Sequence, residues 1–99
     1  MDETSKMEKR RRIEAYEQLF KNDLSEIDKL ANAFDFITRQ SITDSEAEIE
    51  LLRALGDSQS VVKEQIKIST LNHARSIFSD CFRRAAGRKA WNDTDEHRA

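Results

Sequence analysis

Apolar residues recur at helical spacing through the first forty positions of the chain. Between Ile13 and Phe34 they follow one another three or four residues apart. At 100° per residue, such positions gather on one side of an α-helix. The polar segment 22–25 holds residues that can end one helix and cap another, but the apolar stripe keeps its phase across it. The pattern therefore predicts one long helix from about residue 6 to residue 40.

A second helix is predicted to begin at Thr43. Glu46 follows it by three residues, the spacing at which a hydroxyl and a carboxylate together satisfy the first amides of a helix. Acidic side chains are frequent in the next two turns, where they face the positive end of the helix dipole. Gly56 suits the left-handed conformation that closes a helix, and Asp57 or Ser58 can then cap a third helix.

The third segment is less regular at first and becomes clearly periodic from Leu71 to Ala85, ending near Gly87. A helix is expected throughout, because a single strand would have nothing to pair with. Cys81, the only cysteine, lies within this stripe and is expected to fill the core.

Composition supports an all-α fold. The 99 residues include no proline and two glycines, whereas β architectures with many turns need such residues every ten positions or so. We expect a three-helix bundle or a helical hairpin with a long first helix. Residues 1–88 form a single helical domain in this interpretation, and residues 89–99 form a flexible polar tail.

The predicted first helix also bears on oligomeric state. At about 50 Å by the helix rise, it is longer than a compact chain of this size needs, so we expect homodimerisation with coiled-coil packing to complete the fold. The residues at the centres of the stripes form the predicted core: Phe20, Ile27, Phe34, Leu52, Phe78 and Phe82.

The N-terminal residues favour a cytoplasmic, reducing location. Residues 1–6 are polar, and the charged segment that follows has no apolar stretch of the secretory kind behind it. No apolar run approaches the twenty or so residues of a membrane span, so no membrane association is expected. A lone cysteine fits an intracellular protein without disulfides.

Catalytic chemistry has little support in the sequence. His73 is the only histidine before the tail, and Cys81 has Asp80 beside it, which disfavours the thiolate. One cysteine and two histidines contain no ligand cluster of recognised spacing. We therefore expect neither enzymatic activity nor a metal or cofactor.

Charge is distributed unevenly, although the net charge is only −2. Residues 22–60 carry three basic and nine acidic side chains, whereas basic clusters lie toward both ends of the chain. Such clusters can contact phosphates. The candidate nucleic-acid contacts are Lys9, Arg10, Arg11, Arg12, Arg83, Arg84, Arg88 and Lys89.

Two aromatic residues fall outside the predicted core. Phe36 lies nearly opposite the first stripe and Trp91 lies in the polar tail, so either can anchor a partner or fold back on the core. The favoured function is a non-catalytic protein–protein interaction module. It would be a small intracellular regulator or antagonist that binds an unidentified protein through an amphipathic helical surface. The alternative is a helical dimer that binds duplex RNA or DNA through the basic clusters.

Overall fold

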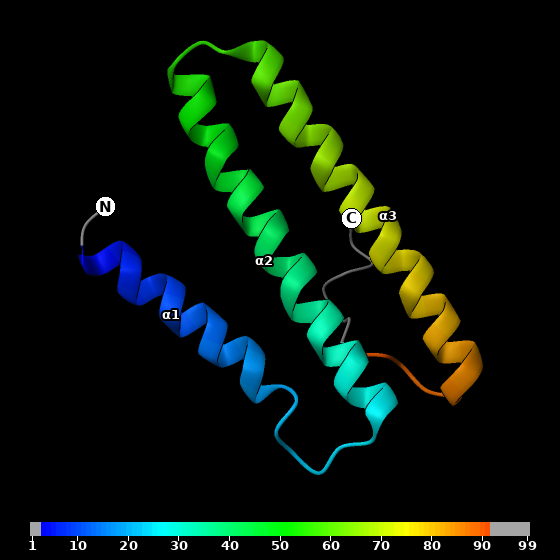
Figure 1. Cartoon of the computed structure of the whole chain (residues 1–99). Helices are drawn as coiled ribbons and strands as arrows, with labels where there is room; N and C mark the ends of the chain where they lie inside the picture. Colours follow the sequence, from blue (N-terminus) through cyan, green and yellow to red (C-terminus); the bar gives the residue numbers. More distant parts are fainter. Residues whose placement is uncertain (1–2, 92–99) are drawn as a thin grey trace.

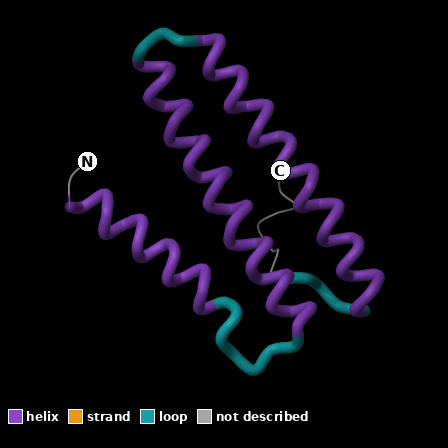
Figure 2. Tube along the Cα trace, viewed as in Figure 1, coloured by secondary structure: helices purple, strands orange, loops and turns teal. Residues whose placement is uncertain are grey.

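The described chain consists of three helices joined by short connections. A computed structural model of the protein describes residues 3–91, with α1 over Glu3–Gln18, α2 over Glu26–Ala54 and α3 over Ser58–Ala86. Helices α2 and α3 form an antiparallel hairpin, and α1 lies against the other side of α2 (Figure 1). Every regular element in the described residues is a helix (Figure 2), so the predicted all-α fold is confirmed.

The hairpin turn is encoded locally, as predicted. Gly56 has a φ of 75°, and its N–H donates to the carbonyl of Arg53 while the N–H of Asp57 donates to that of Leu52. This Schellman pattern satisfies the last carbonyls of α2. The Asp57 carboxylate then accepts from the N–H of Ser60 at 3.1 Å, which caps α3. At its other end, α3 closes on Gly87 in the left-handed conformation.

The single long helix predicted for residues 6–40 is wrong, because α1 ends at Gln18 and α2 starts at Glu26. Within the connection, the amide of Asn22 donates to the carbonyl of Leu19 and its oxygen accepts from the N–H of Leu24, both at 2.9 Å. Such side-chain bonds offer the backbone an alternative to the helix. The apolar residues on either side of this connection keep a three- or four-residue spacing, so the spacing alone does not reveal the break.

The predicted helix start at Thr43 is also wrong, since α2 runs through it to Ala54. The N-cap of α2 is Ser25. Its hydroxyl oxygen accepts from the N–H of Asp28, and its O–H donates to the Asp28 carboxylate at 2.7 Å. Both sites have a hydroxyl followed three residues later by an acid. Only Ser25 has the extended backbone that a cap requires.

The core lies at the open end of the hairpin. The rings of Phe34 and Phe78 stack with centroids 4.4 Å apart, and Phe82 and Trp91 extend this aromatic layer. The chain turns back after Gly87 and buries Trp91 against α2 and α3. The boundary predicted after residue 88 therefore cuts through the core. Residues 92–99 of the predicted tail lie outside the described residues, and their flexibility stays a prediction.

Part of the predicted core is confirmed and part is wrong. Phe82 is buried, Phe34 and Phe78 pack against it, and Leu52 is half-buried. Phe20 and Ile27 are exposed, because Phe20 lies in the connection between α1 and α2 and Ile27 lies in the first turn of α2. The ring of Phe20 packs edge-on against the ring of Tyr16, at the end of α1, rather than against α3.

The helices form a slab that is one layer thick. Its dimensions are 46 × 33 × 17 Å and its radius of gyration is 15.9 Å, compared with about 13 Å for a compact domain of this length. Helix α1 contacts α2 and α2 contacts α3, whereas α1 and α3 are not in contact, so the three helices lie side by side in one row (Figure 1). None of the helices in residues 3–91 is long and apolar enough to cross a bilayer.

The aromatic stack predicts a graded response to truncation. Phe78→Ala should lower the free energy of unfolding by about 3 kcal/mol, because it removes a ring packed between two others. Phe20→Ala is the matched control and should cost clearly less, since that ring is 42% exposed. Urea denaturation followed by circular dichroism measures both. Equal losses would contradict this placement of the core.

Candidate functional site

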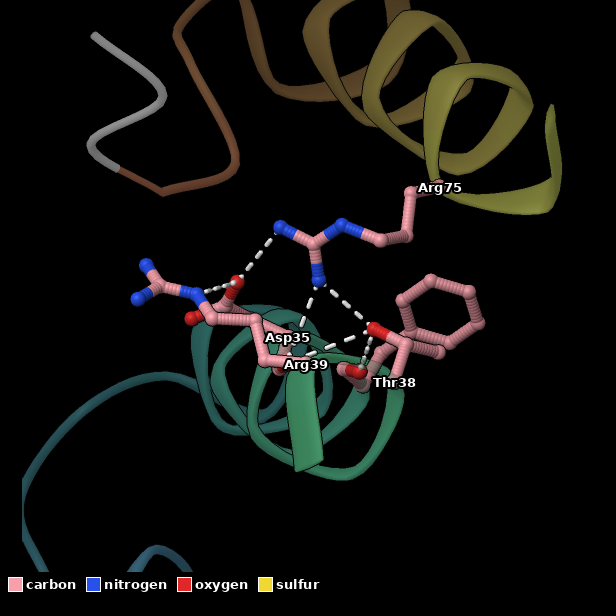
Figure 3. Close-up of polar contacts among 5 residues, drawn as sticks. Asp35, Thr38, Arg39 and Arg75 are labelled. Atoms are coloured by element: carbon pink, nitrogen blue, oxygen red, sulfur yellow. Dashed lines mark hydrogen bonds and ion pairs between the residues drawn. The ribbon is translucent and has the colours of Figure 1, made fainter. Parts of the chain in front are cut away.

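Arg75 is the most deeply buried charged residue of the described chain, with 3% of its surface exposed. Figure 3 shows its guanidinium reaching from α3 onto α2. Nη2 lies 2.8 Å from the carboxylate of Asp35, and Nη1 donates to the hydroxyl of Thr38 at 2.6 Å and to the Asp35 carbonyl at 3.2 Å. The guanidinium carbon also lies 4.7 Å from the ring centroid of Trp91. One side chain thus joins α2, α3 and the returning C-terminal segment.

The partners of Arg75 are themselves fixed. Asp35 accepts a second bond from Arg39 one turn along α2, and the hydroxyl of Thr38 donates to the carbonyl of Phe34 at 2.7 Å. These groups bind one another, so the cluster acts as an internal lock between helices. The sequence interpretation missed it. Arg75 does stand four residues after Leu71 and seven before Phe82, a spacing that places it on the buried face of α3.

The basic cluster of α1 is exposed and partly neutralised. Arg12 forms a two-pronged ion pair with the carboxylate of Asp44 on α2, at 3.1 and 3.2 Å. Lys9, Arg10 and Arg11 lie on the exposed surface of the same helix.

The basic cluster at the end of α3 is held by carboxylates as well. Arg83 and Arg84 both bind Asp80, at 2.7 and 2.8 Å. Arg88 donates to both oxygens of Asp28 at 2.7 Å, and its hydrogen bond, with that of Ser25, lowers the pKa of this carboxyl. Lys89 is exposed.

The structure does not bring the two basic clusters together. One is tied to α2 at Asp44 and the other at Asp28, positions about 24 Å apart by the helix rise. They also approach α2 from different helices, α1 and the end of α3. A continuous phosphate-binding surface formed by both clusters is therefore not present in this arrangement.

The two aromatic candidates differ in their surroundings. Trp91 is buried, and within residues 3–91 its indole N–H finds no acceptor. Phe36 is half-buried, and its ring lies 6.1 Å from that of Tyr16 on α1. Phe36 also lines an open groove of about 390 Å³ between α1 and α2, together with Ile13 and Ile37. Of the two, only Phe36 lies where a partner can approach it.

The residues considered for catalysis lie apart. Cys81 is exposed and was wrongly expected in the core, because it points about 100° away from its buried neighbour Phe82. His73 is exposed on the same helix. Within residues 3–91 no group of histidine, cysteine and carboxylate side chains is arranged to hold a metal.

The buried guanidinium predicts unequal costs for two arginine truncations. Arg75→Ala should lower the free energy of unfolding by about 3 kcal/mol, since it removes the buried cation and its hydrogen bonds to Asp35 and Thr38. Arg84→Ala removes an exposed ion pair on the same helix and should cost less than about 1 kcal/mol. Thermal and urea unfolding of the two variants provide the comparison. A lock function for Arg75 would be ruled out by similar stabilities.

The pair between Asp28 and Arg88 predicts acid sensitivity of the C-terminal segment. The folded pKa of Asp28 lies below its ordinary value of 3.8, so its contribution to stability is present above that pH and is lost as the pH falls through the folded pKa. Trp91, the only tryptophan, should then shift its fluorescence to longer wavelength. In Asp28→Asn the shift should be present at pH 7, whereas Glu26→Gln, on the same turn, should behave like the wild type. An unchanged spectrum for Asp28→Asn would refute the coupling.

Comparison of the chain with protein-family models, with curated proteins and with solved structures finds no match. The described residues form an internal lock at Arg75, two separated basic clusters and an open groove beside Phe36.

Proposed function

We propose that the protein is a non-catalytic protein–protein interaction module that binds its partner through apolar helix surfaces. The observation that carries this proposal is the one-layer slab, whose helices leave large apolar side chains exposed. Stable domains usually bury such side chains between two packed layers of secondary structure, whereas this chain has a single layer of helices. The exposed large apolar residues on α2, at its C-cap Leu55 and on α3 are Ile27, Leu30, Ile37, Leu51, Leu55, Val62, Ile66 and Ile77.

This exposure is more than the scattered apolar residues found on any surface. Val62 and Ile66 are one helical turn apart on α3, and Leu51 on α2 is four residues before Leu55, the C-cap of that helix; each of these four side chains is at least half exposed. Contiguous apolar surface on a soluble chain typically marks an interaction site. Helix-in-groove recognition uses residues at this three- or four-residue spacing.

Charge favours a protein partner over nucleic acid. Arg12, Arg84 and Arg88 each bind a carboxylate of the same chain, and a phosphate would have to displace that partner. The acidic middle third of the sequence, with nine carboxylates, would also repel a nucleic-acid backbone. Binding of RNA or DNA therefore remains the alternative.

Homodimerisation is part of the same proposal, and the shape of the molecule supports it. The sequence-based reason, a first helix of about 50 Å, is lost because that helix is broken at residues 19–25. The slab shape gives another reason, since two copies packed face to face would supply the missing layer. A small regulatory protein in the cytoplasm fits this interpretation.

Two variants separate the protein-binding and nucleic-acid hypotheses. A polar-surface variant replaces Leu51, Leu55, Val62, Ile66 and Ile77 with serine, and a charge variant replaces Arg10, Arg11 and Arg12 with alanine. If apolar surface drives binding, the polar-surface variant should lose the complexes that survive nuclease treatment of a lysate, and the charge variant should retain them. Cross-linking followed by affinity capture measures both, and circular dichroism confirms that each variant is helical.

Sedimentation equilibrium of the purified chain shows whether a second copy is among the partners. A dimer that the polar-surface variant abolishes would support the proposal. Complexes that depend on the three arginines, disappear with nuclease and weaken steeply with salt would overturn it in favour of nucleic-acid binding.

A further inference from the structure

One edge of α2 is covered by α1 along only half of its length. We define the α2 edge by the side chains that face α1 and by their continuation along the helix: Phe36, Gln40, Asp44, Ala47, Leu51 and Leu55. These positions recur every three or four residues, so they lie in one row. The first three line the groove between α1 and α2.

The covered half shows which contacts this edge makes with a helix. Tyr16 of α1 lies beside Phe36, with ring centroids 6.1 Å apart, and Arg12, one turn earlier in α1, binds Asp44. A helix antiparallel to α2 thus contributes an aromatic anchor and, four residues away, a cation that meets a carboxylate of the edge. The covered half of the α2 edge thus contacts a helix through an aromatic side chain that has a basic side chain one turn away.

The second half of the α2 edge is open. Beyond Arg12, the N-terminal part of α1 diverges from α2 (Figure 1), and its Met7 is exposed. Leu51 and Leu55 are 62% and 78% exposed, the highest values among the large apolar side chains of the described residues. The open half is therefore continuous with an existing helix–helix interface.

Carboxylates border this open half. Glu48 and Glu50 lie within one turn of Leu51, and both are exposed. Asp44 stands where the covered half ends. A helix with lysine or arginine beside its apolar stripe would meet opposite charge here, whereas an acidic helix would meet like charge and be disfavoured.

We propose that the open half of the α2 edge, from Ala47 to Leu55, binds a basic amphipathic helix of another protein. This proposal rests on the proposed function and identifies the partner's chemistry. The bound helix runs antiparallel to α2 as α1 does, places leucine-like residues on Leu51 and Leu55, and places lysine or arginine beside Glu48 and Glu50. The distance from Ala47 to Leu55 is about 12 Å by the helix rise, so about two turns of the partner helix lie on the open half.

Two model peptides test the proposal directly. Both are fluorescein-labelled helices of about fourteen residues with the same leucine pattern, one with lysine and the other with glutamate at the flanking positions. Fluorescence anisotropy near physiological salt should show binding of the lysine peptide and at least tenfold weaker binding of the glutamate peptide. Leu51→Ala combined with Leu55→Ala should weaken binding of the lysine peptide at least tenfold.

The matched control lies on α3. Val62→Ala combined with Ile66→Ala removes comparable exposed apolar surface away from the α2 edge and should change the affinity less than twofold. Equal loss in the two double variants, or equal binding of both peptides, would overturn the proposal. A dimer of the purified chain that Leu51→Ala with Leu55→Ala abolishes would overturn it too, by assigning the edge to a second copy.

Capture of the native partner by the variants distinguishes failure of the α2 edge proposal from failure of the proposed function. If the polar-surface variant loses the partner while Leu51→Ala combined with Leu55→Ala retains it, the protein is still an interaction module, but binding at the α2 edge is refuted. Retention of the partner by the polar-surface variant would refute the proposed function itself.

Discussion

The guanidinium of Arg75 determines how the helices of this chain fit together. Burying a cation is costly, and here the cost is offset by hydrogen bonds to Asp35 and Thr38 and by the face of Trp91. Because Asp35 and Thr38 are one turn apart on α2, Arg75 reaches both only in one register of the hairpin. That register places Phe34 on Phe78, and the aromatic stack then receives Trp91. The polar lock and the apolar core are therefore set by the same alignment.

The same alignment decides which side chains remain outside. The face of α2 that meets α3 is occupied largely by small or polar residues, among them Ala31, Thr38 and Ser45. Small side chains let the two helices approach closely but bury little apolar area. Several larger leucine and isoleucine side chains lie on other faces, as Leu51 and Ile66 do, whereas Ile49 is buried. A sequence that is 37% hydrophobic thus has a small core because many of its large aliphatic side chains point away from the hairpin interface.

Features governed by near neighbours were predictable from the sequence, and features that depend on distant residues were not. The turns at Gly56 and Gly87 follow from their own left-handed conformations. The connection at residues 19–25 was missed because its capping signal competed with an unbroken stripe and with a second capping pattern at Thr43. Arg75 was missed because its partners lie 37 and 40 positions away. Trp91 was assigned to a tail because nothing in its polar neighbourhood reveals the stack that receives it.

The weak attachment of α1 bears directly on the open part of the α2 edge. The pair between Arg12 and Asp44 is about half exposed, so it contributes at most about 1 kcal/mol, and the rings of Tyr16 and Phe36 meet at a tilted angle rather than in a close stack. The α2–α3 hairpin has a buried ion pair and an aromatic stack instead. Local opening occurs first where buried contacts are fewest, so α1 detaches more readily than the hairpin separates. A helix bound beside Leu51 that extends toward Phe36 therefore competes with α1 at a small energetic cost.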